Sequence, residues 1–380
     1  MKEIKQIIHA YELACKKQQK AALATVVHVA GSSYRAPGAR MLITEDGMLT
    51  GAISGGCLEG DALRKALMVM MQGKPLLTTY DTSDEEDAVI GIGLGCNGII
   101  QVLIEPIIPE DVTNPIVLLQ HIVQKRQAVV LVTFFSLQNK WSEQQGTRLL
   151  LKADKNFLRS NALLPSAIKD AENILEQKES IFIEYPNDGQ PISAFYEYLP
   201  PPVSIIVAGA GNDVFPLVQI GEVLGWDITL VDGRPAYANT QRFPACRLIV
   251  ADPESAFREL VIDDQTAVVL MTHNYNYDKA LLKALIAMPV NYIGMLGPRK
   301  KLSRMLTEYE EEGTKVTEEQ LSRVYSPVGL DIGAETAEEI ALAVLTEIKA
   351  VFAGRSGVYL RSFTGKMHER KTEIISSNTN

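Results

Sequence analysis

Long hydrophobic runs are missing from this sequence of 380 residues. The longest apolar stretches, such as residues 128–135, are too short to span a bilayer. The first residues, MKEIKQIIHAYELACKK, mix charged side chains with apolar ones at helical spacing, which is typical of a packing helix and not of a signal peptide. We therefore expect a soluble, cytoplasmic protein with no membrane partner.

The sequence also has few cysteines and no excess of positive charge. The 4 cysteines lie far apart without any CxxC pair, which excludes a zinc-finger type site and a disulfide framework: Cys15, Cys57, Cys96 and Cys246. The chain has 37 Lys and Arg residues against 46 Asp and Glu residues, and its net charge is −9. We expect no nucleic-acid partner, because a surface that binds nucleic acid carries clustered basic residues.

The length of the chain predicts two or three domains. Three prolines at residues 200–202 form a stiff segment that marks the clearest boundary. Before this segment we predict an N-terminal α+β domain over residues 1–110. A small α/β region over residues 111–199 completes its sheet or bridges to the next domain. After the prolines we predict a Rossmann-like domain over residues 203–355 and a polar tail over residues 362–380.

The chain after the prolines has the order of a Rossmann unit. An apolar strand meets Gly209 and Gly211, a helix follows, and a second strand ends at Asp232. In such units the acid at this place accepts hydrogen bonds from a ribose hydroxyl. Strands and helices continue to alternate towards the C-terminus, which predicts a doubly wound parallel sheet.

An ordinary dinucleotide site is disfavoured in this unit. Val214 replaces the third glycine, and Asp213 places a negative charge in the first helical turn, where a pyrophosphate normally binds. Polar residues nevertheless follow later strands, on the side where such sheets bind ligands. We predict that His273 acts as an acid, a base or a ligand, and that Arg299 binds a phosphate, although solvation alone explains a surface arginine nearly as well.

The sequence GIGLGCNG matches the dinucleotide pattern only as text, because an apolar strand follows Gly98 where a helix is required. Its glycines let the backbone approach another group closely, and the loop presents Cys96. A simple bend in a sheet explains the same residues, so both interpretations stay open.

The densest special chemistry lies in residues 31–61, GSSYRAPGARMLITEDGMLTGAISGGCLEGD. An Asp-Gly pair between apolar runs predicts a hairpin, which brings the two ends of this stretch together. Gly55 and Gly56 then place Cys57 at a helix start, where free N–H groups and the helix dipole lower the pKa of a thiol and attract anions.

Two arginines, Arg35 and Arg40, lie just before this hairpin and add local positive charge to an acidic chain. We therefore predict a site in this stretch. Residue types alone leave an alternative open, in which Cys57 is a small buried hydrophobe and the Gly-Gly pair is only a tight turn.

Two segments resemble the XdhC/CoxI family. The first is residues 31–61 with GLGCNG downstream, and the second holds IIVAGAGN, LVDGRP, MTHNYNYD, YIGMLGPRKK and GLDIGAETAEEIALAVLTEI. On this resemblance Cys57 is the cysteine of the family's SGGC motif, Cys96 lies in its GLGC loop and His273 in its TH motif. Asn212 stands where the family commonly has histidine.

The resemblance implies a maturation factor for molybdenum hydroxylases such as the xanthine dehydrogenase of purine catabolism, and not the catalytic dehydrogenase itself. Such a factor binds the molybdenum cofactor transiently, helps it to acquire its terminal sulfur ligand and inserts it into the apoenzyme. The implied partners are an apo-xanthine dehydrogenase or a related hydroxylase and a cysteine desulfurase, and we expect a homodimer.

For this cofactor we expect Cys57 as the metal ligand, because soft molybdenum and its sulfur suit a thiolate. We expect Cys57 and His273 as reactive groups, with Arg35 and Arg40 near the phosphate of the molybdopterin. Further contacts are expected from the loops and strand ends: Ser32, Ser33, Gly55, Gly56, Cys96, Gly209, Gly211, Asn212, Asp232 and Arg299.

Two alternatives stay open. An NAD(P)-dependent oxidoreductase would use Asp232 for the ribose and His273 as acid or base. A non-catalytic subunit of a xanthine dehydrogenase complex would form that complex without binding any ligand.

Overall fold

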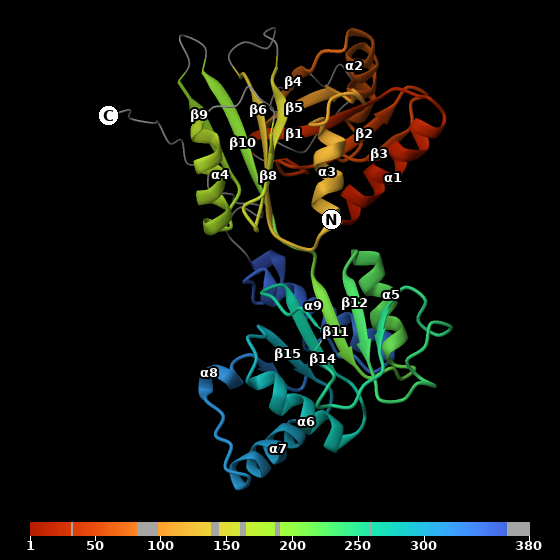
Figure 1. Cartoon of the computed structure of the whole chain (residues 1–380), viewed down its shortest axis with the longest axis vertical. Coiled ribbons are helices and arrows are strands. Elements are labelled where there is room, and N and C mark those ends of the chain that lie inside the picture. Colours follow the sequence, from red (N-terminus) through yellow and green to blue (C-terminus); the bar gives the residue numbers. More distant parts are fainter. Residues whose placement is uncertain are drawn as a thin grey trace. The chain divides into compact units, whose positions relative to one another are not determined.

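The structure, a computed structural model, describes residues 1–31, 33–81, 98–137, 144–159, 165–186, 191–258 and 260–362 (Figure 1). These residues form two compact units, Met1–Pro201 and Pro202–Thr364, and the division falls in the proline segment. We describe each unit by itself.

The first unit contains two antiparallel sheets. The first sheet has the order β3-β2-β1-β5-β4 and is made of β1 (Ala21–Gly31), β2 (Arg40–Thr44), β3 (Leu49–Gly51), β4 (Leu76–Asp81) and β5 (Gly98–Pro106). Its side chains alternate between the two faces, so that Ala22, Ala24 and Val26 of β1 pack towards α2 (Glu59–Gln72). This helix ends at Gly73, which adopts a left-handed conformation that suits glycine.

The second sheet packs against the other face of the first. Its order is β8-β7-β6-β10-β9, from β6 (Val129–Phe135), β7 (Gly146–Lys152), β8 (Phe157–Arg159), β9 (Ile181–Tyr185) and β10 (Ile192–Leu199). The helices α1 (Lys2–Lys16) and α3 (Pro115–Gln124) share a core with both sheets, whereas α4 (Pro165–Gln177) covers the outer face of the second sheet.

The described residues of 111–199 lie in the same compact unit as residues 1–110, in line with the first of the two alternatives given for this region, in which it completes the N-terminal domain. The reason is the shared core, since Leu23 of the first sheet and Leu131 of the second lie in one buried cluster. The prediction of an α+β fold before the prolines is confirmed. The loop with Cys96 lies outside the described residues.

The second unit is a doubly wound parallel sheet, as the sequence predicted. Its order is β13-β12-β11-β14-β15-β16, from β11 (Ser204–Ala208), β12 (Asp227–Val231), β13 (Arg247–Ile249), β14 (Thr266–Leu270), β15 (Tyr292–Met295) and β16 (Val324–Tyr325). Two helices pack on each face: α5 (Val214–Leu224) and α9 (Ala337–Phe352) on one, α6 (Tyr275–Ile286) and α7 (Arg299–Glu311) on the other. The short α8 (Glu318–Leu321) precedes β16.

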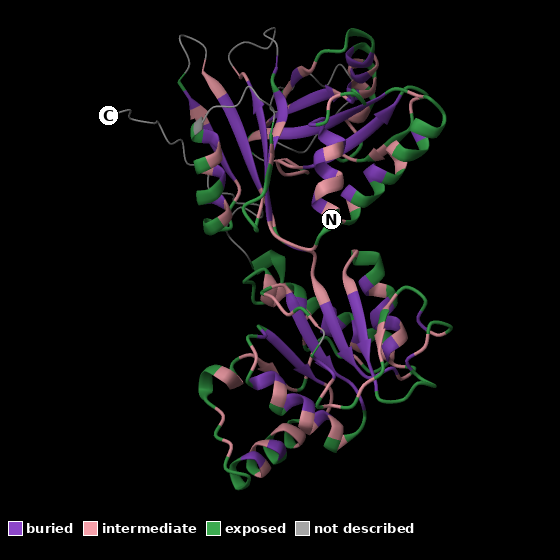
Figure 2. Ribbon diagram, viewed as in Figure 1, coloured by how far each residue is buried: buried purple, intermediate pink, exposed green. Residues whose placement is uncertain are grey.

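Strand order places the ligand side of this sheet. From β11 the chain adds β12 and β13 on one side of the sheet, and it then returns to add β14 on the other side of β11. The carboxyl ends of β11 and β14 therefore flank the switch point where open α/β sheets bind ligands. Figure 2 shows these central strands buried beneath the helices. The loops that follow them thus carry the candidate residues.

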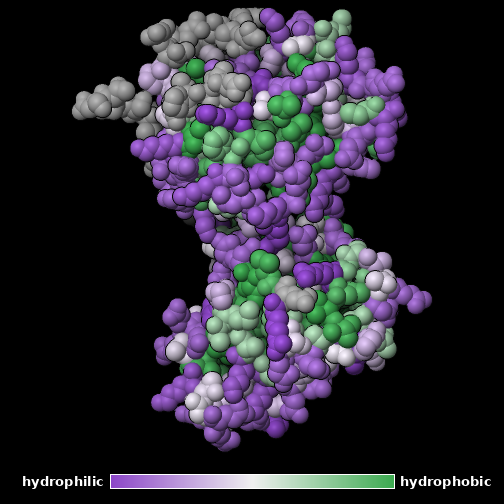
Figure 3. All heavy atoms as spheres, in the orientation of Figure 1, coloured by the Kyte–Doolittle hydropathy of each residue, from purple (hydrophilic) through white to green (hydrophobic). Residues whose placement is uncertain are grey.

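The surface keeps some hydrophobic residues, and Figure 3 shows them gathered in patches on the visible face. Val223 and Leu224 at the end of α5 and Leu342 of α9 are exposed examples. Within the described residues, every helix is too short or too polar to cross a bilayer.

Candidate functional site

The thiol of Cys57 lies half-buried in a bend between β3 and α2. Its Sγ donates a hydrogen bond to Ser54 Oγ at 3.4 Å. The same serine oxygen accepts from the backbone N–H groups of Gly56 at 3.2 Å and Leu58 at 3.1 Å. One serine hydroxyl therefore organises the whole Gly-Gly-Cys loop.

A carboxylate holds this serine in place. Glu59 accepts hydrogen bonds from the Ser54 N–H at 2.9 Å, from the Leu58 N–H at 3.1 Å and from the Ser54 hydroxyl. Burial opposes the charge of Glu59, but these hydrogen bonds outweigh it, so the pKa of the carboxyl is lowered. Helix α2 begins at Glu59, two residues after Cys57. The carboxylate of Glu59 accepts a hydrogen bond from the Leu58 N–H, one of the N–H groups at this helix start, so a ligand would have to compete for it.

Sequence reasoning missed Ser54 and Glu59. Their spacing of five residues is not the capping-box spacing of three, so no helix-start pattern pointed to them. A serine and a glutamate on either side of Gly-Gly-Cys were the available signal.

The two ends of the 31–61 stretch meet, as the hairpin predicted. The ring of Tyr34 lies over Gly55, where an added Cβ would contact it at 3.6 Å. Ser33 is turned inward along its own loop, since its Oγ donates to the Arg35 carbonyl at 2.6 Å. Ser32 lies outside the described residues.

The two arginines of this stretch already have acidic partners. Arg35 Nη2 pairs with Glu3 of α1 at 2.6 Å, and about a third of its side chain remains exposed. The guanidinium of Arg40 is buried, with 4% of its side chain exposed, and pairs with Glu197 of β10 while donating to the Gly38 carbonyl at 2.9 Å. Because this guanidinium is enclosed and paired, the predicted contact of Arg40 with a phosphate has no support in this geometry and stays a prediction.

The glycine turn after β11 is shaped by close approach of two backbone segments. Gly209 has φ +121°, and a Cβ there would collide with the carbonyl of Met271 at the end of β14. Only glycine fits without displacing that strand end. The next N–H, of Ala210, donates to Asp232 Oδ2 at 2.9 Å.

Asp232 lies at the end of β12, but its oxygens are already used. Arg234 donates to it from its backbone N–H, Nε and Nη2, at 2.9, 2.9 and 2.7 Å, and Ala210 supplies a fourth hydrogen bond. Although burial opposes its charge, these donors lower the pKa of Asp232. A carboxylate has about four acceptor positions, and four donors already use them here, so the predicted hydrogen bond from a ribose to Asp232 has no support in this geometry and stays a prediction.

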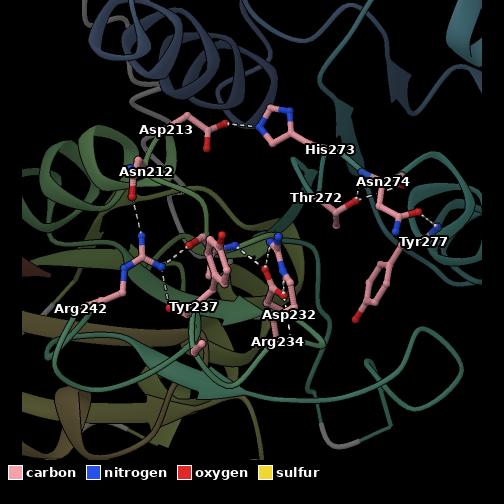
Figure 4. A network of polar contacts seen from close by, with 12 residues as sticks. Asn212, Asp213, Asp232, Arg234, Tyr237, Arg242, Thr272, His273, Asn274 and Tyr277 are labelled. Carbon is pink, nitrogen blue, oxygen red and sulfur yellow. Dashed lines mark hydrogen bonds and ion pairs between the residues drawn. The ribbon is translucent and has the colours of Figure 1, made fainter.

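Asp213 and His273 join the two sides of the switch point. Figure 4 shows them pointing toward one another, with His273 Nε2 donating to Asp213 Oδ2 at 2.7 Å. The Asp213 carboxylate also lies over Gly211, where a Cβ would collide with it. His273 has φ +56°, a conformation uncommon outside glycine, and its side chain is 62% exposed. Among the residues that the structure describes, no hydrogen bond to the Nδ1 of this imidazole is found.

Asn212 is held by an arginine that the sequence analysis did not single out. Arg242 Nη2 donates to Asn212 Oδ1 at 2.8 Å, and Arg242 Nη1 donates to the carbonyls of Ala210 and Tyr237 at 2.7 and 2.9 Å. The amide of Asn212 is thus a structural link to the segment after β12.

At the next strand ends, Lys301 and Thr272 both bind the fully buried Asp278, each at 2.6 Å. Lys301 is therefore a structural residue. Arg299 is exposed at the start of α7, and within the described part of the chain no side-chain partner binds it. Its predicted phosphate contact stays a prediction. The described residues contain no group of three or more His, Cys, Asp or Glu side chains placed to hold a metal ion.

Two family profiles match the chain. Residues 14–81 match the profile described as the XdhC and CoxI family, and residues 205–348 match the profile described as the XdhC Rossmann domain. The first range holds the Cys57 loop, and the second holds the glycine turn and His273.

Three relatives cover most of the chain. A probable xanthine dehydrogenase subunit of Bacillus subtilis (strain 168) is 32% identical over 87% of this chain and 93% of its own length. The molybdenum cofactor insertion chaperone PaoD of Escherichia coli (strain K12) is 24% identical over 87% of this chain and 83% of its own. A crystal structure of a xanthine dehydrogenase from Bacillus halodurans superimposes with a TM-score of 0.72 at 29% identity, over 92% of this chain and 97% of that one.

Proposed function

Because the chain belongs to the XdhC and CoxI family, we propose that it binds the molybdenum cofactor as cargo and inserts it into a xanthine dehydrogenase-type molybdenum hydroxylase. Support for its sulfuration, with a cysteine desulfurase as partner, is part of this proposal. So is a cytoplasmic homodimer. A relative named as a molybdenum cofactor insertion chaperone supports the insertion role.

The Cys57 loop is the observation that carries the proposal. The sulfur is neither sealed in the core nor held in a disulfide, and a network of Ser54 and Glu59 fixes the loop that presents it. A thiol is the soft ligand that molybdenum and its sulfur prefer. Ser54 Oγ accepts the hydrogen bond of Sγ and so orients the thiol, while Tyr34 lies over the neighbouring Gly55.

The test measures the cargo directly. The protein is purified from a molybdate-grown host together with a Cys57→Ala variant, and molybdenum and pterin are quantified per chain. We expect the variant to lose most of both and to stop activating apo-hydroxylase, because the metal loses its protein ligand. Cys15→Ser is the matched control, since Cys15 is a free, exposed cysteine on α1. A Cys57→Ala protein that retains its cofactor and still activates the apoenzyme would remove Cys57 from the mechanism.

The surface supports an interaction with another protein chain, as insertion requires. Large apolar side chains are exposed on α5 and α9, namely Val223, Leu224 and Leu342. Exposed apolar groups that gather in patches are typical of protein interfaces.

An NAD(P)-dependent oxidoreductase is a weaker candidate. Asp213 lies over the glycine turn where a pyrophosphate would bind, and Asp232 has no acceptor position left for a ribose. Titration with NAD(H) and NADP(H) tests this alternative, and tight binding of either would favour it.

A non-catalytic subunit of a xanthine dehydrogenase complex is the second candidate, favoured by the name of the Bacillus subtilis relative. Such a component stays with its hydroxylase, whereas an insertion factor leaves once the cofactor is delivered. Size-exclusion chromatography after activation separates the two: a stable stoichiometric complex with the loaded hydroxylase would favour the permanent component.

A further inference from the structure

Among the described residues, Arg242 makes hydrogen bonds but no ion pair. Its three hydrogen bonds go to uncharged acceptors, the carbonyls of Ala210 and Tyr237 and the amide oxygen of Asn212. In the part of the chain that the structure describes, no carboxylate lies within ion-pair distance of it. A guanidinium has five N–H donors, so two of its donors remain for a ligand.

The guanidinium is also fixed in place. It lies 5.0 to 5.3 Å from the centroids of three aromatic rings, those of Phe215, Phe243 and Tyr237. Together with its hydrogen bonds, these rings orient the arginine before any ligand arrives. Such an arginine loses little conformational freedom on binding, which strengthens its contact with an anion.

Arg234 lies on the same tyrosine. Its guanidinium is 4.0 Å from the centroid of the Tyr237 ring, and half of its side chain is exposed. Asp232 balances one positive charge, so the three groups Asp232, Arg234 and Arg242 carry a net charge of about +1. Figure 4 shows both arginines beside Tyr237, next to the glycine turn.

Two neighbours limit which anion fits. The carboxylate of Asp213 over Gly211 repels a pyrophosphate at the helix start. The saturated oxygens of Asp232 do not accept from the hydroxyls of a ribose. These two neighbours disfavour a dinucleotide and leave a single phosphate group as the anion to test.

We propose that Arg234 and Arg242 bind a phosphate monoester at the carboxyl edge of the second unit's sheet. This inference rests on the proposed function, because the phosphate of molybdopterin is one source of such a group, and a nucleoside monophosphate is the other. It moves the expected phosphate contact from Arg40, which is buried, to a different pair of arginines.

The test is calorimetric titration with inorganic phosphate and with 5′-AMP, with adenosine as the uncharged control. We expect wild-type protein to bind both phosphates and not adenosine. Arg242→Gln removes the charge and shortens the side chain, and it is expected to weaken phosphate binding about tenfold or more. Arg304→Gln is the matched control, because Arg304 is exposed on α7, and it should bind as wild type does.

Arg242→Lys is the control for misfolding, because it changes the same residue but keeps the positive charge. At equal thermal stability, it should bind phosphate more tightly than Arg242→Gln does. Wild-type affinity for phosphate in both variants would overturn the proposal. A second measurement, the pterin content of protein from a molybdate-grown host, identifies the molecule that supplies the phosphate group. Pterin lost from Arg242→Gln assigns the phosphate to the cofactor, and unchanged pterin with weakened 5′-AMP binding assigns it to a nucleotide. All Arg242 variants keep Cys57, so wild-type phosphate binding in them overturns the Arg234 and Arg242 site alone and leaves the proposed function, which Cys57→Ala tests, standing.

Discussion

At the scale of single residues, burial separates arginines that look alike in the sequence. Arg40 and Arg35 flank the same short loop, yet Arg40 is enclosed with Glu197 and Arg35 stays partly exposed beside Glu3. Breaking a buried ion pair leaves a charge without its partner. Charge alone therefore does not identify a ligand site.

We predict that Arg40→Ala destabilises the first unit by about 3–5 kcal/mol, because the Glu197 carboxylate is left buried and unpaired. Urea unfolding measures this free energy. Arg64→Ala is the control, since the Arg64–Asp61 pair is on the surface and should contribute less than about 1 kcal/mol. Equal losses in the two variants would contradict the structural role of Arg40.

A buried acid between the sheets gives a pH dependence. Burial raises the pKa of Glu105 above its ordinary value of 4.5, and hydrogen bonds from Thr147 offset only part of this shift. The folded state thus binds the proton more tightly than the unfolded state. Its contribution to stability is complete below the ordinary pKa and is lost as the pH rises through the raised one.

We therefore expect Glu105→Gln to be stabilised relative to wild type as the pH rises from about 4 to about 8, because glutamine cannot ionise. Urea unfolding of both proteins across this range measures the difference. A difference in unfolding free energy that does not change with pH would show that Glu105 keeps its ordinary pKa.

At the scale of elements, the glycine turn and the start of α5 decide which ligand the second unit accepts. Asp213 and His273 close the switch point from its two sides. The carboxylate, more than the missing third glycine, is the obstacle to a pyrophosphate.

Asp213→Asn is expected to raise the affinity for NAD⁺ about fivefold, because one negative charge leaves the site of the pyrophosphate. Calorimetric titration with NAD⁺ measures the change. Asp331→Asn removes an exposed charge from another loop and serves as control. An unchanged affinity in Asp213→Asn would mean that the charge of Asp213 is not what disfavours dinucleotides.

Local patterns predicted the elements well but not their partners. The Asp-Gly hairpin, the helix after Cys57 and the parallel sheet follow from periodicity and turn residues, which act over short stretches. The pairings of Arg40 with Glu197 and of Arg242 with Asn212 join residues far apart in the chain, and no local pattern encodes them. The two-residue strand β16 is likewise too short to show a period.

At the scale of the whole molecule, the chain offers a presented thiol in one unit and a cationic site in the other. We propose each site within its own unit: a thiol at Cys57 suits a soft metal, and the guanidinium of Arg242 suits a phosphate. Family membership covers both units, since the two matched ranges lie on either side of the proline segment.

The most direct measurement of the central claim is the alkylation rate of each cysteine, followed by mass spectrometry, in cofactor-loaded and cofactor-free protein. Cys15 is exposed and serves as the internal control for the activity of the alkylating reagent. Cys246 should react slowly because burial raises the pKa of its thiol to about 11. We expect bound cofactor to slow the alkylation of Cys57 and to leave the alkylation rate of Cys15 unchanged. A Cys57 that reacts equally fast with and without bound cofactor would contradict this expectation.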